Sequence, residues 1–190
     1  MSADAWTAIF TGLVAATAVW ALVCARQQLK QFRESEQVQH LLRFVEQFDA
    51  APLMNTRKSL AEKRLKGVDD PPELENILNF FETIGLLVKR RYLDAYDVWA
   101  CFSYWMFSVF ADFRDLIEQE QKEDPTYYAD FTALVERLRM IEKAEHGLSD
   151  RPSRDDIEEF WRYELDLTTG LPATRRRPRK LSRRSAKPNN

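Results

Sequence analysis

The residues with the greatest potential for chemistry are a carboxylate and an amide in one apolar stretch. Glu82 follows Asn79 by three residues, so a helix would place the two side chains next to each other. Acid–base catalysis needs two carboxylates that face one cleft. Asp112 or Asp115 would complete such a pair with Glu82 if their helices cross at the right height. We therefore name Asn79 and Glu82 as a candidate binding site.

The same two residues also have a structural interpretation, which we favour. If they are buried, Asn79 and Glu82 need hydrogen-bonding partners such as Arg114 or Tyr104, and they then clamp the third and fourth helices together. The sequence contains no glycine-rich phosphate loop, Gly-x-Ser-x-Gly, His-Glu-x-x-His or Cys-x-x-Cys motif. We therefore assign no catalytic residue, and an enzyme with its site near Asn79 and Glu82 is the alternative.

Metal and disulfide chemistry are not expected either. The two cysteines, Cys24 and Cys101, lie far apart in the sequence, and so do His40 and His146. This distribution gives neither the ligand spacing of a zinc site nor a disulfide framework. We expect no metal and no cofactor, and a reducing compartment for most of the chain.

The strongest functional signal is a basic C-terminal segment. The last sixteen residues hold eight Lys or Arg and no acid, and because the whole chain carries −2, everything before them carries −10. These residues are Arg175, Arg176, Arg177, Arg179, Lys180, Arg183, Arg184 and Lys187. Such a tail is expected to contact anionic lipid. The alternatives are nucleic acid, the acidic part of the same chain, or no partner.

A second signal is the uncharged stretch Ala5–Ala25, which is 21 residues long. As a helix it would measure about 31 Å, close to the hydrocarbon thickness of a bilayer. Trp6 and Trp20 lie near its ends, where indole rings favour the headgroup level. The stretch is too long for a signal peptide and lacks its basic leader and cleavage site. It predicts a single membrane-spanning helix.

Flanking charges orient this helix, and small residues give it a face for pairing. Arg26 and the basic residues that follow it predict that the N-terminus is outside and the rest of the chain is cytoplasmic. Ala8, Gly12 and Ala16 recur every four residues, a spacing that lets two such helices pack closely. A homodimer is therefore one expectation for the oligomeric state.

The rest of the chain has the periodicity of helices. We expect the first helix to continue as a polar stalk over 26–37, to become amphipathic, and to end before Pro52. Further helices are expected over 53–65, 72–91, 94–124, 126–146 and from 153 to about 168. Asp70 is the expected N-cap of the third, Pro125 opens the fifth, and Ser153 and Asp156 have the spacing of a capping box.

One stretch of the third helix and the turn after it resembles a known family. The residues are Asn79-Phe80-Phe81-Glu82-Thr83-Ile84-Gly85-Leu86-Leu87-Val88-Lys89-Arg90, followed by Tyr92-Leu93-Asp94 and the helix that contains Val98-Trp99. They are similar to the bacterial domain-of-unknown-function family 4760, over about Ala5 to Leu138. The resemblance implies one N-terminal membrane helix and a helical cytoplasmic domain, and it implies no activity.

The sequence therefore predicts an all-α protein of about five bundled helices on a single-span anchor. Its parts are a membrane anchor (1–25), a polar stalk (26–37), a cytoplasmic helical domain (38–168) and a disordered basic tail (169–190). The expected role is a non-catalytic interaction or regulatory module of the bacterial inner membrane. Gly85 is expected to mark a place where a neighbouring backbone approaches, because glycine inside a helix costs about 1 kcal/mol relative to alanine.

Overall fold

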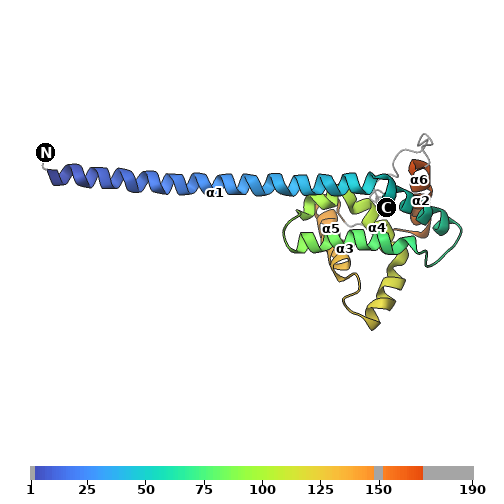
Figure 1. Ribbon diagram of the computed structural model, residues 1–190. Coiled ribbons are helices and arrows are strands. Elements are labelled where there is room, and N and C mark those ends of the chain that lie inside the picture. The colour runs from blue at the N-terminus through green and yellow to red at the C-terminus, as the bar shows by residue number, and fades with distance from the viewer. Residues whose placement is uncertain (1–2, 148–151, 169–190) are drawn as a thin grey trace, which may run out of the picture. The chain divides into compact units, whose positions relative to one another are not determined.

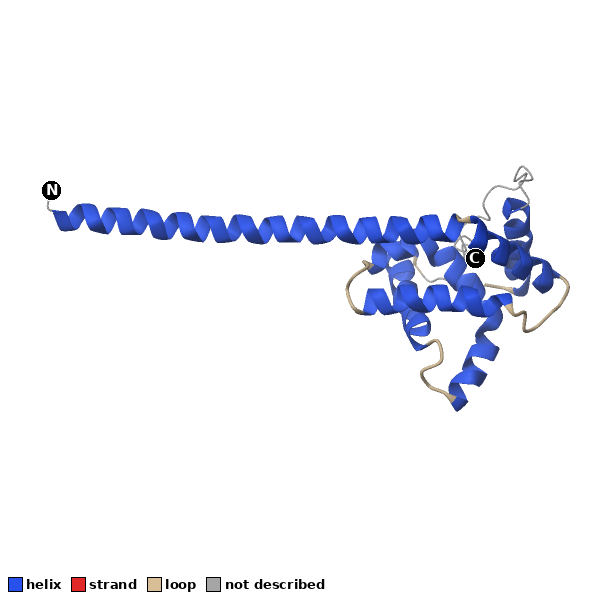
Figure 2. Cartoon of the chain, viewed as in Figure 1, coloured by secondary structure: helices blue, strands red, loops and turns tan. Residues whose placement is uncertain are grey.

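The computed structural model describes residues 3–147 and 152–168. In that part of the chain every regular element is an α-helix, which confirms the expected all-α class (Figures 1 and 2). The helices are α1 (Ala3–Asp49), α2 (Ala51–Leu65), α3 (Glu73–Lys89), α4 (Ala95–Glu123), α5 (Ala129–His146) and α6 (Arg154–Thr168).

The chain divides into two compact units, Met1–Gln39 and His40–Asn190. The described part of the first unit is helical and belongs entirely to α1. The second unit contains the last turns of α1 together with α2 to α6.

The first unit is where the sequence predicts a membrane span. Its backbone is continuous helix through Ala5–Ala25 and onward through the expected stalk. No helix in the described part of the chain is long and apolar enough to cross a membrane. Most side chains of residues 5–19 lie outside the described residues. The span is thus not supported by the structure, and it stays a prediction from sequence.

The break between α1 and α2 follows from a proline. Pro52 has no N–H to give to the Phe48 carbonyl, and inside a continuing helix its ring would clash with that carbonyl. Ala50 is accordingly extended, with φ −69° and ψ 149°, and α2 begins at the next residue. The Phe48 carbonyl accepts a hydrogen bond from Arg57 Nη1 at 2.8 Å instead. The helix break therefore supplies an acceptor to a buried arginine.

Aromatic side chains form the centre of the second unit. Phe81 of α3 is fully buried and stacks on Phe131 of α5, with ring centroids 5.7 Å apart. Phe48, from the last turn of α1, lies 5.4 Å from Phe102 and 5.3 Å from Trp105 of α4. Each fully buried phenylalanine contributes about 1.5–3 kcal/mol to stability. These contacts join α1, α3, α4 and α5 into one core.

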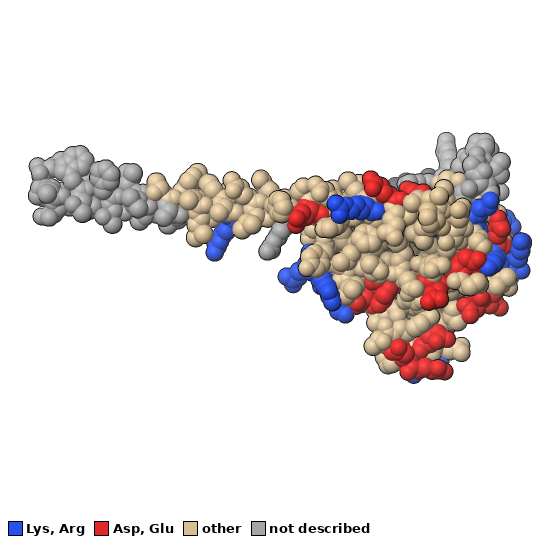
Figure 3. Space-filling model, in the orientation of Figure 1, with Lys and Arg blue, Asp and Glu red and all other residues tan. Residues whose placement is uncertain are grey.

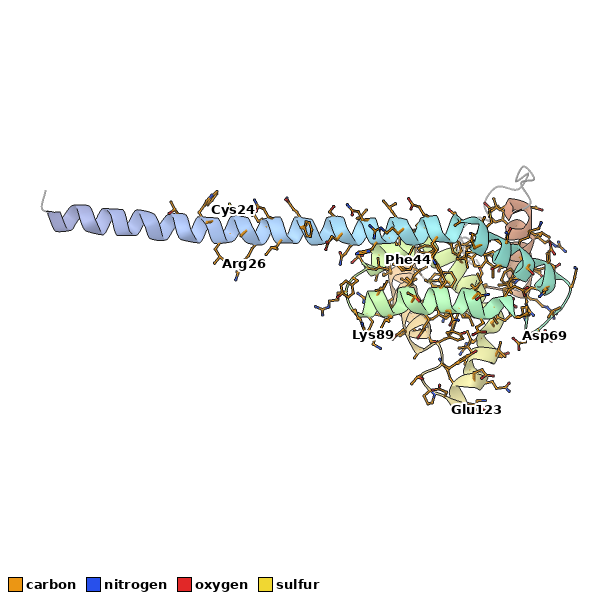
Figure 4. The ribbon with its side chains drawn as sticks, viewed as in Figure 1. Cys24, Arg26, Phe44, Asp69, Lys89 and Glu123 are labelled. Carbon is orange, nitrogen blue, oxygen red and sulfur yellow. The ribbon has the colours of Figure 1, made fainter. Side chains whose placement is uncertain are left out.

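The last turns of α1 lie along α3 as well as α4. Phe44, labelled in Figure 4, packs edge-on against Phe80 of α3 at 5.8 Å between centroids. The uncharged stretch of α4 from Val98 to Ala111 contributes much of the core, including the fully buried Met106 and Val109. This stretch therefore lies in the core of the second unit.

The capping box predicted for α6 is present, whereas the predicted N-cap of α3 and the predicted start of α5 are not observed. Ser153 and Asp156 form the expected capping box: Asp156 Oδ2 accepts the Ser153 N–H at 2.8 Å, and Ser153 Oγ accepts the Asp156 N–H at 3.2 Å. Asp70 is not the N-cap of α3, which begins at Glu73 with Pro72 in the cap position and no side-chain cap. The Pro71 carbonyl accepts the Leu74 N–H at 2.9 Å, so the turn before α3 is closed by backbone alone.

The expected start of α5 at Pro125 was also wrong. Asp124 Oδ1 accepts hydrogen bonds from the Thr126 N–H at 2.9 Å and the Thr126 hydroxyl at 2.7 Å. The Asp124 carbonyl accepts the Tyr127 N–H, and Tyr128 adopts a left-handed conformation with φ 47°. These contacts make a turn in place of the first helical turn, so α5 begins at Ala129.

Gly85 of α3 lies directly against the backbone of α5. A Cβ at this position would lie 2.5 Å from the Asp130 carbonyl carbon and 3.0 Å from the Phe131 amide nitrogen. No side chain fits there without moving the backbone of α5. The expectation that a backbone approaches Gly85 is therefore confirmed.

We predict that Gly85→Ala destabilises the protein although alanine is the better helix former. Overpacking against backbone costs about 1–3 kcal/mol or more, which exceeds the gain of about 1 kcal/mol in helix propensity. Urea unfolding of the full chain in detergent, followed by circular dichroism, measures the difference. The matched control is Thr83→Ala on the exposed side of α3, expected to stay within about 0.5 kcal/mol. Equal stability of the two variants would contradict the close packing.

Candidate functional site

Glu82 binds the start of α5. Its Oε1 accepts the Asp130 N–H at 3.1 Å and its Oε2 accepts the Phe131 N–H at 2.6 Å. The first N–H groups of a helix have no partner within the helix, and its N-terminal end carries partial positive charge. A half-buried carboxylate from α3 therefore caps α5 from outside, beside the Gly85 contact.

The partners of this site differ from those expected. Arg114 pairs with Glu118 on its own helix, and Tyr104 packs edge-on against Phe160 of α6. Asn79 is exposed on α3. The expected clamp between the third and fourth helices differs from the contact that is observed, in which Glu82 joins α3 to α5 through backbone amides.

Asp112, the carboxylate proposed to form a pair with Glu82, binds residues of α2 and α6 instead. Arg64 of α2 donates to both Asp112 oxygens, from Nε at 2.9 Å and from Nη2 at 2.7 Å. The Trp161 indole of α6 donates to Asp112 Oδ2 at 2.7 Å. Asp112 thus ties α4 to α2 and α6, whereas Glu82 ties α3 to α5. The contacts of the two carboxylates share no residue.

The most buried ionic contact was not anticipated. Arg57 of α2 is 6% exposed and Glu164 of α6 is 1% exposed. Arg57 Nε donates to Glu164 Oε1 at 2.7 Å, and Nη2 lies 2.5 Å from the same oxygen. The Trp105 indole donates to Glu164 Oε2 at 3.2 Å. Burial raises the pKa of the Glu164 carboxyl, while Arg57 and Trp105 act in the opposite direction.

Three tryptophan indole groups in the second unit each donate a hydrogen bond to a carboxylate. Trp99 donates to the buried Glu142 of α5 at 2.7 Å, Trp105 to Glu164, and Trp161 to Asp112. Each bond joins two helices, with a tryptophan N–H on one and a carboxylate on the other. A buried carboxylate without such a donor would lose its hydration without replacement. The arrangement holds helices together through matched polar pairs.

Two features of the sequence indicate the Arg57–Glu164 ion pair, which the sequence analysis did not predict. On α6, Glu164 occupies the position that continues the apolar face of Ile157, Phe160 and Trp161. On α2, Arg57 is three residues before the buried Leu60 and therefore shares its face. A charge on an apolar helix face indicates a buried ion pair, but only the structure shows which helix supplies the opposite charge.

On the face shown in Figure 3, acidic side chains gather at the end of the second unit where α4 ends, and basic and acidic side chains lie side by side elsewhere. Lys89 at the end of α3 pairs with Asp130 of α5 at 2.6 Å. Glu123, at the far end of α4, is exposed among other acidic residues. In the described part of the chain no group of histidine, cysteine or acidic residues has the geometry to hold a metal ion.

The eight basic residues from Arg175 to Lys187 lie outside the described residues, so their contacts remain a prediction. Cys101 is an exposed residue of α4 whose thiol is partly shielded from water by its neighbours, and this desolvation together with the nearby Asp97 raises the pKa of the thiol. A raised pKa leaves less thiolate and makes this thiol less reactive.

Comparison with known proteins identifies a family but no activity. A family model described as a domain of unknown function, DUF4760, matches residues 7–138, which is more than half of the chain. The chain therefore belongs to this family. The match covers α1 to α4 and the first part of α5, and α6 lies outside it. No curated protein and no solved structure matches the chain.

We predict different effects for substitutions at the two residues of the candidate site. Glu82→Ala removes two hydrogen bonds to a charged acceptor at the start of α5 and costs about 1.5–3 kcal/mol. Asn79→Ala, on the exposed side of the same helix, stays within about 0.5 kcal/mol. Urea unfolding of both variants provides the comparison. If Glu82→Ala leaves stability unchanged, the capping role is wrong and a functional role for this carboxylate gains support.

Proposed function

We propose that this DUF4760 member is a non-catalytic interaction module held at the bacterial inner membrane by one helix, with its helical domain in the cytoplasm. The observation that carries this proposal is the use of the acidic side chains inside the second unit. Glu82, Asp112, Glu142 and Glu164 each accept hydrogen bonds from a donor on another helix.

This use of carboxylates favours binding over catalysis. A general acid or base must reach the proton it transfers within hydrogen-bond distance. Glu164 is almost fully enclosed and engaged by Arg57 and Trp105, so its bonding capacity serves the fold. The alternative of an enzyme near Asn79 and Glu82 has less support, because Glu82 caps α5 and Asp112 binds Arg64.

Two features support the anchor. The stretch Ala5–Ala25 carries no charge, and it forms part of one uninterrupted helix. Most of its described side chains are exposed, with Trp20 72% exposed and Leu22 57% exposed. Apolar surface costs about 25 cal/mol per Å² in water and nothing comparable in lipid. A bilayer would therefore stabilise this helix.

The basic tail, residues 169–190, is consistent with a position at the cytoplasmic face of the membrane. With the N-terminus outside, residues 169–190 lie on the cytoplasmic side, near an anionic leaflet. Each Lys or Arg close to such a surface contributes about 1 kcal/mol. Phosphorylation of Ser182 or Ser185, which lie among the basic residues, would weaken this contact by adding negative charge.

We predict that the full chain stays with membranes after a wash in alkaline carbonate. A variant with Val14→Lys and Ala18→Lys should move to the supernatant, since each lysine at the centre of a span costs about 2.5–3.5 kcal/mol. The control with Gln27→Lys and Gln31→Lys carries the same added charge in the stalk and should stay with the membrane. Release of the unchanged chain would disprove the anchor.

We also predict that the tail contacts lipid in a charge-dependent manner. A fluorophore at the C-terminus of the chain in nanodiscs should be quenched by lipid-attached quenchers when the lipid is anionic, and not when it is neutral. High salt should abolish the effect by screening. The control chain has the eight basic residues replaced by glutamine. If duplex DNA quantitatively displaces the tail from anionic lipid at physiological salt, nucleic acid is the better partner.

A further inference from the structure

The last helix, α6, packs along α2 and also meets α4, and its most buried side chains lie on one face. Ile157, Phe160, Trp161 and Glu164 follow the spacing i, i+3, i+4 and i+7. The last three are at most 2% exposed, whereas Glu158 on the opposite side is exposed. This spacing is how an amphipathic helix is recognised when it binds another protein.

The surface that receives α6 consists of Arg57, Tyr104, Trp105, Asp112 and Phe113, and we call it the α6-binding surface. Phe160 lies 4.8 Å from the Trp105 ring and 5.3 Å from the Tyr104 ring. Trp161 lies 6.2 Å from the Phe113 ring and donates to Asp112. Glu164 completes the contact at Arg57.

Contacts without α6 hold this surface in place. Arg57 is bound to the Phe48 carbonyl, and its guanidinium lies 4.0 Å from the Phe48 ring centroid. The two Asp112 oxygens are fixed by Arg64. The charged groups that recognise α6 are therefore pre-positioned by α1 and α2, and pre-positioned groups lower the cost of binding a helix.

The Tyr104 hydroxyl lies at the same contact and has no hydrogen-bond partner in the described part of the chain, although it is buried. Buried hydroxyl groups are nearly always bonded. The fit of α6 thus satisfies Arg57 and Asp112 but leaves a polar group of the receiving surface unmatched, which a helix with a polar side chain at that point would satisfy.

We propose that the α6-binding surface is a recognition site for an amphipathic helix of a partner protein, and that α6 is its intramolecular occupant. This inference rests on the proposed function as an interaction module. The partner helix carries aromatic residues at i+3 and i+4, the second of them a tryptophan, and a carboxylate at i+7. Arg57 selects the carboxylate and Asp112 selects the indole N–H. A short connection from α5 keeps α6 at high effective concentration, so a partner must compete with it.

The test uses the full chain in detergent with a specific protease site placed between Gly147 and Pro152. A fluorescent peptide of residues 152–168 is added before and after cleavage, and anisotropy reports binding. The uncut chain should bind the peptide at least tenfold more weakly than the cut chain, because tethered α6 competes. A helix of unrelated sequence that carries only the four anchor residues should displace the peptide from the cut chain.

Matched peptides distinguish the anchors from general helix binding. Glu164→Lys in the peptide should weaken binding to the cut chain at least tenfold, while Glu158→Ala should leave it unchanged. Loss of helicity on removal of α6, absence of exchange, or failure of the anchor-only helix would each show that α6 is a permanent core helix and overturn the proposal. None of these results depends on carbonate extraction, so the anchor and the recognition site fail or succeed separately.

Discussion

The second unit depends on the matching of each enclosed carboxylate to a donor from a different helix. Removing a carboxylate from water costs several kcal/mol unless hydrogen bonds replace its hydration. Apolar packing between helices tolerates small slides and rotations, but a bond from the Trp161 indole to Asp112 exists in only one register. The polar pairs therefore fix which helices meet and at what height, while the phenylalanine core supplies most of the burial.

This constraint explains why an ion pair such as Arg57–Glu164 belongs to the fold without being its main source of stability. A buried pair gains Coulomb energy but loses the hydration of two ions, and the net contribution is often near zero. Burial raises the pKa of the Glu164 carboxyl, and the adjacent Arg57 guanidinium acts in the opposite direction. Removing Arg57 would leave the Glu164 carboxylate inside the domain without this cation, whereas Arg57 also pairs with Asp49. The pair is thus better understood as a requirement on the position of α6.

Local signals in the sequence predicted the helices well and their mutual contacts less well. Apolar periodicity, Pro52 and the Ser153–Asp156 box act over a few residues, so the helices and several of their boundaries, among them the ends of α2 at Leu65 and of α5 at His146, could be inferred. Gly85 indicated a close backbone approach, yet nothing local named α5 as the neighbour. The bonds from Glu82 to α5 and from Arg57 to α6 span 49 and 107 positions in the chain, and pairing at such distances is decided by packing. The expected N-cap of α3 and the expected start of α5 were wrong because backbone and side-chain turns replaced the expected caps.

Helix α6 lies outside the region that the family model matches, but the residues that bind it lie inside that region. The family model ends at residue 138, yet the polar groups that bind α6 all lie within the matched region, on α2 and α4. Arg57 is held by the α1–α2 break and Asp112 by Arg64, so both are organised by that region itself. With α6 in place the Arg57 guanidinium is enclosed, and the carboxylates of Asp49 and Glu164 both lie beside it. Glu164 of α6, which lies outside the matched region, accepts the hydrogen bond from Arg57, so this contact joins a helix inside the matched region to one outside it.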